Sequence, residues 1–232
     1  MRGFFRSGLI YSLMSMGSLI ASSPIVGAGQ AEDLRLTVLT HSYVDLPAEA
    51  LSEAQQRAEK VFALAGIETE WIYCSAVNTQ TQDQPPCSQV QGGPTVFSLS
   101  IVPRQMAQQY PVHTDTLGFA PLQGDKGFAL HAWVFFERVK ELVNRHKATG
   151  EEEAPSLAVV LGHVIVHEIA HLLGVDHANG GLMKAGWAKN ELKQMARTEV
   201  FFTPRQAEIV RKELLRRLRI PNVSVELSDG PR

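Results

Sequence analysis

The sequence predicts an α/β fold, because a strand–helix–strand pattern comes first and a long apolar helix pattern follows later. Residues 34–40 alternate apolar and polar side chains, as a half-buried strand does. Residues 47–65 form an amphipathic helix pattern rich in Ala, Glu and Gln, which stops at Gly66. Residues 68–74 predict a second strand that contains two aromatic β-formers. This unit predicts a sheet with a helix packed against it.

More strand patterns lie between this unit and the apolar helix. Residues 95–102 predict a third strand of the same sheet. The remaining predictions in this region are strands at 117–121 and 127–136, a joining turn at 123–126, a short helix at 136–146 and a polar loop at 147–153.

Residues 155–173 are rich in apolar side chains and end before Gly174, which predicts a mostly buried helix with Pro155 at or near its first turn. A last helix is predicted from the capping box of Thr203 and Gln206 to about Leu218, and the final dozen residues are predicted to be a tail. Basic residues alternate with apolar ones along this last helix and predict a solvated face. They are Arg211, Lys212, Arg216, Arg217 and Arg219.

The buried helix carries a metal-binding pattern. His167 and His171 are four residues apart, hence about 40° apart around the axis and about 6 Å apart along it, so both imidazoles can point at one cation. His177 would lie about 9 Å further along a continuing helix, so the chain must turn back. Gly174 stands where a left-handed cap residue allows that turn. Three neutral imidazoles leave one tetrahedral position open, which is the pattern of a catalytic zinc ion.

Glu168 lies beside these histidines and is better interpreted as a base than as a ligand. Zinc lowers the pKa of a coordinated water to about 7, and a carboxylate within hydrogen-bond reach can accept that proton. The whole stretch reads H-E-x-x-H-x-x-G-x-x-H, with Met183 six residues after the third histidine.

This motif resembles that of the metzincin clan of zinc endopeptidases. The resemblance implies that His167, His171 and His177 bind zinc, that Glu168 is the general base, and that Met183 belongs to a Met-turn beneath the metal. It also implies a mixed, twisted sheet with two long helices in an N-terminal lobe, a small, mostly helical C-terminal lobe, and a zinc cleft between them.

In that clan, an edge strand upstream of the zinc helix pairs with extended substrate. The match suggests this role for Leu117, Gly118, Phe119 and Ala120, with Gly118 allowing close backbone approach; the alternative is an ordinary hairpin edge. Ala178, after the third histidine, matches no subfamily, and Ala185 stands where some families carry a transition-state Tyr. The subfamily is therefore left unassigned.

The first 31 residues predict a secretory signal, because a positive start is followed by a short apolar stretch and small residues at Ala28 and Ala31. An uncleaved anchor is the alternative. The signal predicts a secreted or periplasmic protein. In that setting Cys74 and Cys87 are expected to form one disulfide rather than remain free thiols. Residues 32–232 are then expected to form one domain, divided into lobes at 32–174 and 175–232.

The formal net charge is −2, and no basic stripe suggests nucleic-acid binding. We expect a monomer that acts on a peptide or protein and that is not inserted in a membrane after signal cleavage. The leading hypothesis is an exported zinc-dependent endopeptidase. Two alternatives stay open: a non-catalytic binding module pinned by zinc, and a zinc hydrolase acting on another amide such as cell-wall peptide.

Three other side chains near the motif allow more than one interpretation. His163 lies four residues before His167 and is expected to pack or to support the ligands rather than to bind metal. Asp176 is a candidate acceptor for a ligand imidazole. Trp187 is expected in the core, with the cleft wall as the alternative.

Overall fold

A five-stranded mixed sheet is the centre of the computed structural model, which describes residues 34–74, 87, 90–121, 128–148, 153–198 and 200–220. The strand order is β2-β1-β3-β5-β4, and the first four of these run parallel while β4 is an antiparallel edge strand. The strands are β1 (Leu34–Ser42), β2 (Ile67–Cys74), β3 (Val96–Val102), β4 (Gly118–Phe119) and β5 (His131–Phe135). This arrangement confirms the predicted α/β class.

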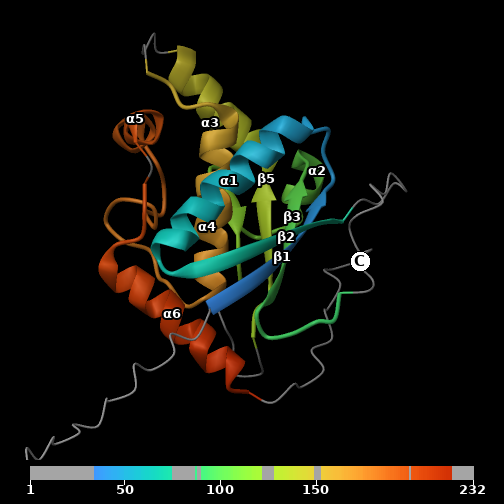
Figure 1. The fold of residues 1–232 in the computed structure, drawn as a ribbon. Helices are drawn as coiled ribbons and strands as arrows, with labels where there is room; N and C mark the ends of the chain where they lie inside the picture. The colour runs from blue at the N-terminus through green and yellow to red at the C-terminus, as the bar shows by residue number, and fades with distance from the viewer. Residues whose placement is uncertain are drawn as a thin grey trace, which may run out of the picture. The chain divides into compact units, whose positions relative to one another are not determined.

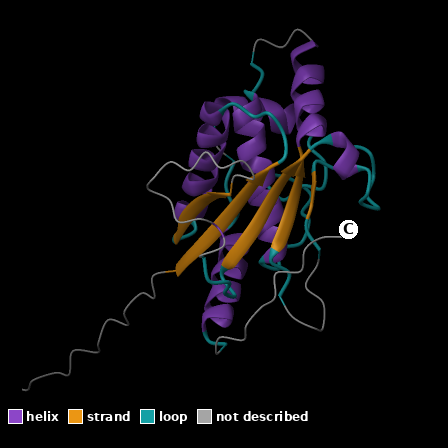
Figure 2. Ribbon diagram, turned by 90° about the vertical axis from the view of Figure 1, so that its right-hand side faces the viewer, coloured by secondary structure: helices purple, strands orange, loops and turns teal. Residues whose placement is uncertain are grey.

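Six helices are present in the described residues, and the two long helices α1 and α4 lie side by side against one face of the sheet (Figure 1). Figure 2 shows the sheet as one layer with these helices behind it. None of the helices in the described parts of the chain is both long and apolar enough to cross a membrane. The helices are α1 (Ala48–Leu64), α2 (Arg104–Ala107), α3 (Phe136–Ala148), α4 (Leu157–Leu172), α5 (Lys189–Arg197) and α6 (Pro204–Leu218).

Most predicted elements are confirmed, but several boundaries differ. Helix α4 begins after Ser156, whose hydroxyl accepts a hydrogen bond from the Val159 amide and caps the helix, and Pro155 lies directly before this cap, near the first turn as predicted. Strand β4 has two paired residues instead of the five predicted, and β5 is also shorter than predicted. Helices α2 and α5 were not predicted. The signal at 1–31, the turn at 123–126 and the tail after residue 220 lie outside the described residues.

The sheet buries one face against the main core and the other face only in part, since successive side chains of a strand point to opposite sides and Arg35 and Glu68 on the second face are exposed. In β1, Leu36 and Val38 face helices α1 and α4 and belong to the main core. Leu39 faces the other side, where it packs with Ile72 and with the disulfide formed by Cys74 and Cys87. The predicted disulfide is therefore present, and it holds Cys87 beside the end of β2.

Helices α1 and α4 cross closely because small residues meet at the crossing. A Cβ at Gly162 of α4 would lie 2.6 Å from the carbonyl oxygen of Ala54 and 2.8 Å from the Cβ of Arg57, both on α1. No side chain fits in that space. Glycine at this position therefore sets how near α4 lies to α1.

The last helix fixes the end of α4 through a buried arginine. Arg217 is 0% exposed, and its guanidinium donates to the carbonyl oxygen of Leu172, to that of Pro94 at 3.2 Å and to the carboxylate of Glu213 at 2.8 Å. Its guanidinium carbon also lies 4.6 Å from the ring centre of Phe128. The predicted solvated face is therefore wrong for Arg217, which neutralises a carbonyl at the negative end of the α4 dipole.

Replacement of Arg217 tests this anchor. Arg217→Ala leaves the buried Leu172 carbonyl without its partner and removes one of the two arginines that bind Glu213, and we expect it to lower the free energy of unfolding by about 3–5 kcal/mol. Lys212→Ala removes an exposed cation from the same helix and is expected to cost at most about 1 kcal/mol. Urea unfolding followed by circular dichroism measures both values. Equal midpoints for the two variants would contradict the anchoring role.

Candidate metal centre

Helix α4 carries the central part of the site inside the core. Every residue from 158 to 172 is buried, which confirms the predicted buried helix. Four of these residues are polar, and each needs a partner or a ligand, because burying a polar group without one costs free energy. They are His163, His167, Glu168 and His171.

The end of α4 is a tight left-handed turn. Gly174 has φ +78°, its amide donates to the carbonyl of His171, and the Val175 amide donates to the carbonyl of Ala170, both at 3.0 Å. These two bonds form a Schellman motif, which reverses the chain at a helix end. The Val175 carbonyl in turn accepts a hydrogen bond from Nδ1 of His171 at 2.7 Å. One turn therefore sends the chain back toward the site and orients a histidine of the helix.

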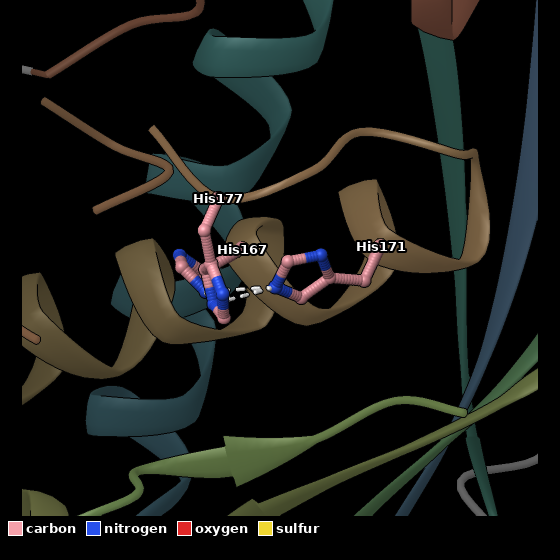
Figure 3. Close-up of side chains that lie close together, drawn as sticks. All are labelled: His167, His171 and His177. Carbon is pink, nitrogen blue, oxygen red and sulfur yellow. Dashed lines mark hydrogen bonds between the residues drawn. The ribbon is translucent and has the colours of Figure 1, made fainter. Parts of the chain in front are cut away.

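The three predicted ligands meet at one point (Figure 3). His167 and His171 project from α4, and His177 reaches them from the loop after the turn. The Nε2 atoms of His167 and His171 lie 3.0 Å apart, and that of His177 lies 3.3 Å from the first and 3.1 Å from the second. The three imidazoles can hold one metal ion.

The hydrogen bonds on the far side of the rings fix which nitrogen is free. Nδ1 of His167 donates to the Leu182 carbonyl at 2.8 Å, and Nδ1 of His171 donates to Val175, so both Nε2 atoms carry lone pairs. The lone pairs on these two Nε2 atoms repel each other. A proton on Nε2 of His177 could form a hydrogen bond to one of them but could not satisfy both. Around a tetrahedral zinc ion with Zn–N bonds of 2.0–2.1 Å, ligand nitrogens lie about 3.4 Å apart. The observed spacing fits that ion.

Burial keeps two of the predicted ligands, His167 and His171, neutral, as metal binding requires. The pKa of His167 falls to about 3 because burial disfavours its charged form and because His171 lies beside it. Burial also lowers the pKa of His171. Near neutral pH both rings therefore present an unprotonated Nε2 to a cation.

Glu168 is buried beside these ligands and is 5% exposed. Among the residues that the structure describes, none donates a hydrogen bond to its carboxylate or forms an ion pair with it. Burial alone raises its pKa to about 8 in the metal-free chain. A divalent cation nearby favours the charged carboxylate, so this raised value belongs to the chain without metal.

A cleft of about 430 Å³ opens over the histidines and Glu168. The predicted substrate-binding residues Leu117–Ala120 form one of its walls. Lys184 and Trp187 form part of the other side, and Lys184 is paired with Glu191 of α5 at 2.5 Å. No motif marks Lys184, since it simply follows Met183 in the chain.

The three side chains with open interpretations are now placed. His163 accepts a hydrogen bond from the Val200 amide at 3.2 Å and donates to the Val159 carbonyl at 2.7 Å, so it supports the fold and does not face the ligands. Asp176 is exposed and makes no hydrogen bond to a ligand imidazole; backbone carbonyls fill that role. Trp187 is both buried and in the cleft wall, with its ring edge-on to His167 at 5.8 Å. Met183 is fully buried, while its function as a Met-turn stays a prediction.

Comparisons with known proteins give weak matches. No family model matches the chain, and no curated protein matches it. Archaemetzincin from Methanopyrus kandleri is similar with 15% identity and a TM-score of 0.47, over 81% of this chain and 99% of that one. Metalloproteinase-II from Bacteroides fragilis has 12% identity and a TM-score of 0.45, over 78% of this chain and 54% of that one. A zinc-dependent peptidase from Methanocorpusculum labreanum has 16% identity and a TM-score of 0.43, over 77% and 99%. This likeness is too weak to assign the chain to a family.

Metal binding is tested by removing one imidazole. We expect the wild-type chain to bind one zinc ion, and His171→Ala to lower the zinc affinity by more than about 100-fold, since loss of a supporting residue alone costs 10- to 100-fold. His113→Ala removes an exposed imidazole outside the cluster and should leave affinity unchanged. Competitive titration against a zinc chelator measures all three proteins. Unchanged binding by His171→Ala would show that the ion is held elsewhere.

Proposed function

We propose that this protein is an exported zinc-dependent endopeptidase. His167, His171 and His177 are its zinc ligands, Glu168 is its general base, and residues 32–232 form its catalytic domain. The observation that carries the proposal is the convergence of three Nε2 atoms within 3.0–3.3 Å, beside a buried carboxylate and at the floor of a cleft.

The donor set fits a catalytic zinc ion rather than a structural one. Three imidazoles leave a coordination position open, whereas structural zinc sites are closed by four protein ligands. A zinc ion held here would act as a Lewis acid that polarises the scissile carbonyl and activates water near neutral pH. The exposed position of His177 leaves this side of the site open to the cleft.

Glu168 would move the proton in this reaction. Its carboxylate would accept a proton from the attacking water as the new carbon–oxygen bond forms. It would then give that proton to the amide nitrogen as the carbon–nitrogen bond breaks, so that an amine leaves. The free lone pairs of the carboxylate support this role, because no hydrogen bond in the described structure occupies them.

The edge strand supports a peptide as substrate. Strand β4 pairs with β5 on one side, and it is the last strand of the sheet on the other. An extended peptide can add to such an edge through backbone hydrogen bonds. Because β4 lines the same cleft as the histidines, a peptide bound there would lie across the site. The disulfide is consistent with export, since disulfides persist in oxidising compartments.

Glu168→Gln tests the general base. The amide has nearly the same shape but cannot accept the proton, so we expect kcat for a peptide substrate to fall by about 10²- to 10⁴-fold while zinc still binds. A fluorogenic peptide library and metal analysis measure the two properties. Glu208→Gln, at an exposed position of α6, serves as the matched control and should cleave like the wild type.

Metal removal completes that test. A chelator should stop cleavage by the wild-type protein, and added zinc should restore it. Zinc binding without any cleavage by the wild type would favour a non-catalytic binding module in which zinc has a structural role. Cleavage by Glu168→Gln at the wild-type rate would show that another group is the base.

A further inference from the structure

Gly118 of the edge strand lies directly against Glu168. A Cβ built at Gly118 would be 2.6 Å from Cγ and from Oε1 of Glu168, and 2.7 Å from its Cδ. Such distances fall below van der Waals contact, so the side chain of Glu168 occupies the space that a side chain at residue 118 would need. The two residues are fifty positions apart in the sequence and are brought together by the packing of α4 against β4.

The backbone at Gly118 does not itself demand glycine. The described glycines with positive φ are Gly66, Gly174 and Gly181, and Gly118 is not among them. It also pairs in regular register with Val134 of β5. Glycine is therefore needed at residue 118 because the side chain of Glu168 fills the space that a larger side chain would occupy.

We infer that Gly118 is a positioning residue for the general base, an assignment that rests on the proposed role of Glu168. No hydrogen bond or ion pair from the described residues holds the carboxylate, so steric contact with the edge strand sets its place in the cleft. The sequence pattern suggested that Gly118 allows a substrate backbone to approach. In the structure, the group that lies close to Gly118 is the side chain of Glu168.

A methyl group at residue 118 has one easy way to be accommodated. Rotation of the Glu168 side chain relieves all three short distances, whereas moving β4 would disturb its pairing with β5. The fold and the imidazoles then stay in place while the carboxylate leaves its position. Because a displacement of about 1 Å at a reacting group can cost 100-fold in rate, the effect falls on the chemical step.

Gly118→Ala in the full-length protein tests this inference. We expect kcat for a peptide substrate to fall by about 10- to 100-fold, with KM, zinc affinity and unfolding temperature unchanged. A crystal structure of the metal-free variant should show Glu168 in a different rotamer. Gly180→Ala adds the same methyl group where nothing lies within 4 Å and where φ is ordinary, and it should match the wild type in every measurement.

A second substitution identifies the partner of Gly118. Glu168→Ala removes every atom beyond Cβ, including the Cγ, Cδ and Oε1 that lie too close to a Cβ at residue 118. Gly118→Ala should therefore cause no further loss of the residual kcat in the E168A background, although it lowers kcat in the wild type. Equal losses in both backgrounds would overturn the inference, as would an unchanged Glu168 rotamer or a rise in KM with kcat unchanged.

The outcomes also separate this inference from the proposed function. Full activity of Glu168→Gln would refute the assigned base and, with it, the role of Gly118. Loss of activity in Glu168→Gln together with wild-type behaviour of Gly118→Ala would leave the base in place and refute the positioning role alone.

Discussion

The site depends on a geometric constraint: one straight helix can bring two imidazoles to a cation but not the third. The Schellman turn at Gly174 meets this constraint, because it ends α4 and directs the chain back so that His177 faces His167 and His171. The same turn exposes the Val175 carbonyl to Nδ1 of His171. Reversal of the chain and orientation of a ligand are therefore two results of one backbone conformation, and a side chain at residue 174 would strain both.

The surroundings of α4 hold this turn in place. Gly162 lets α1 pack closely along the middle of the helix, and Arg217 bonds the Leu172 carbonyl two residues before the turn. A buried guanidinium is costly unless it is paired and hydrogen-bonded, and each of the three nitrogens of Arg217 donates a hydrogen bond, one to Glu213 and two to backbone carbonyls. His167 and His171 therefore project from an element fixed at its middle and at its end, which suits residues that could hold a metal ion in a defined geometry.

Hydrophobic periodicity and the spacing of the motif were enough to predict the sheet strands β1 to β3, the long helices and the three converging histidines. They were not enough for α5, because its nine residues bury only Leu192 and Met195 and its N-cap residue is Ala188, whose side chain cannot accept a hydrogen bond. Arg217 was also missed, since a basic residue four positions after Glu213 has the same local pattern on a solvated face as in a core. The contact of Gly118 with Glu168 has no local signal at all, because it arises from the packing of two distant elements.

The proposed base, Glu168, contacts Gly118 instead of accepting hydrogen bonds from the described residues, and this has a chemical consequence. Hydrogen bonds to a carboxylate stabilise its charged form and lower its pKa, which makes it a weaker base. Gly118 has no side chain that would displace the Glu168 carboxylate. None of the described residues donates a hydrogen bond to this carboxylate, so its lone pairs stay free, and its burial raises its pKa. His163 shows the opposite arrangement on the same helix: both of its ring nitrogens are occupied by backbone groups, and it takes no part in the metal cluster. On α4 the backbone therefore satisfies the ring nitrogens of His163, whereas none of the described residues donates a hydrogen bond to the Glu168 carboxylate.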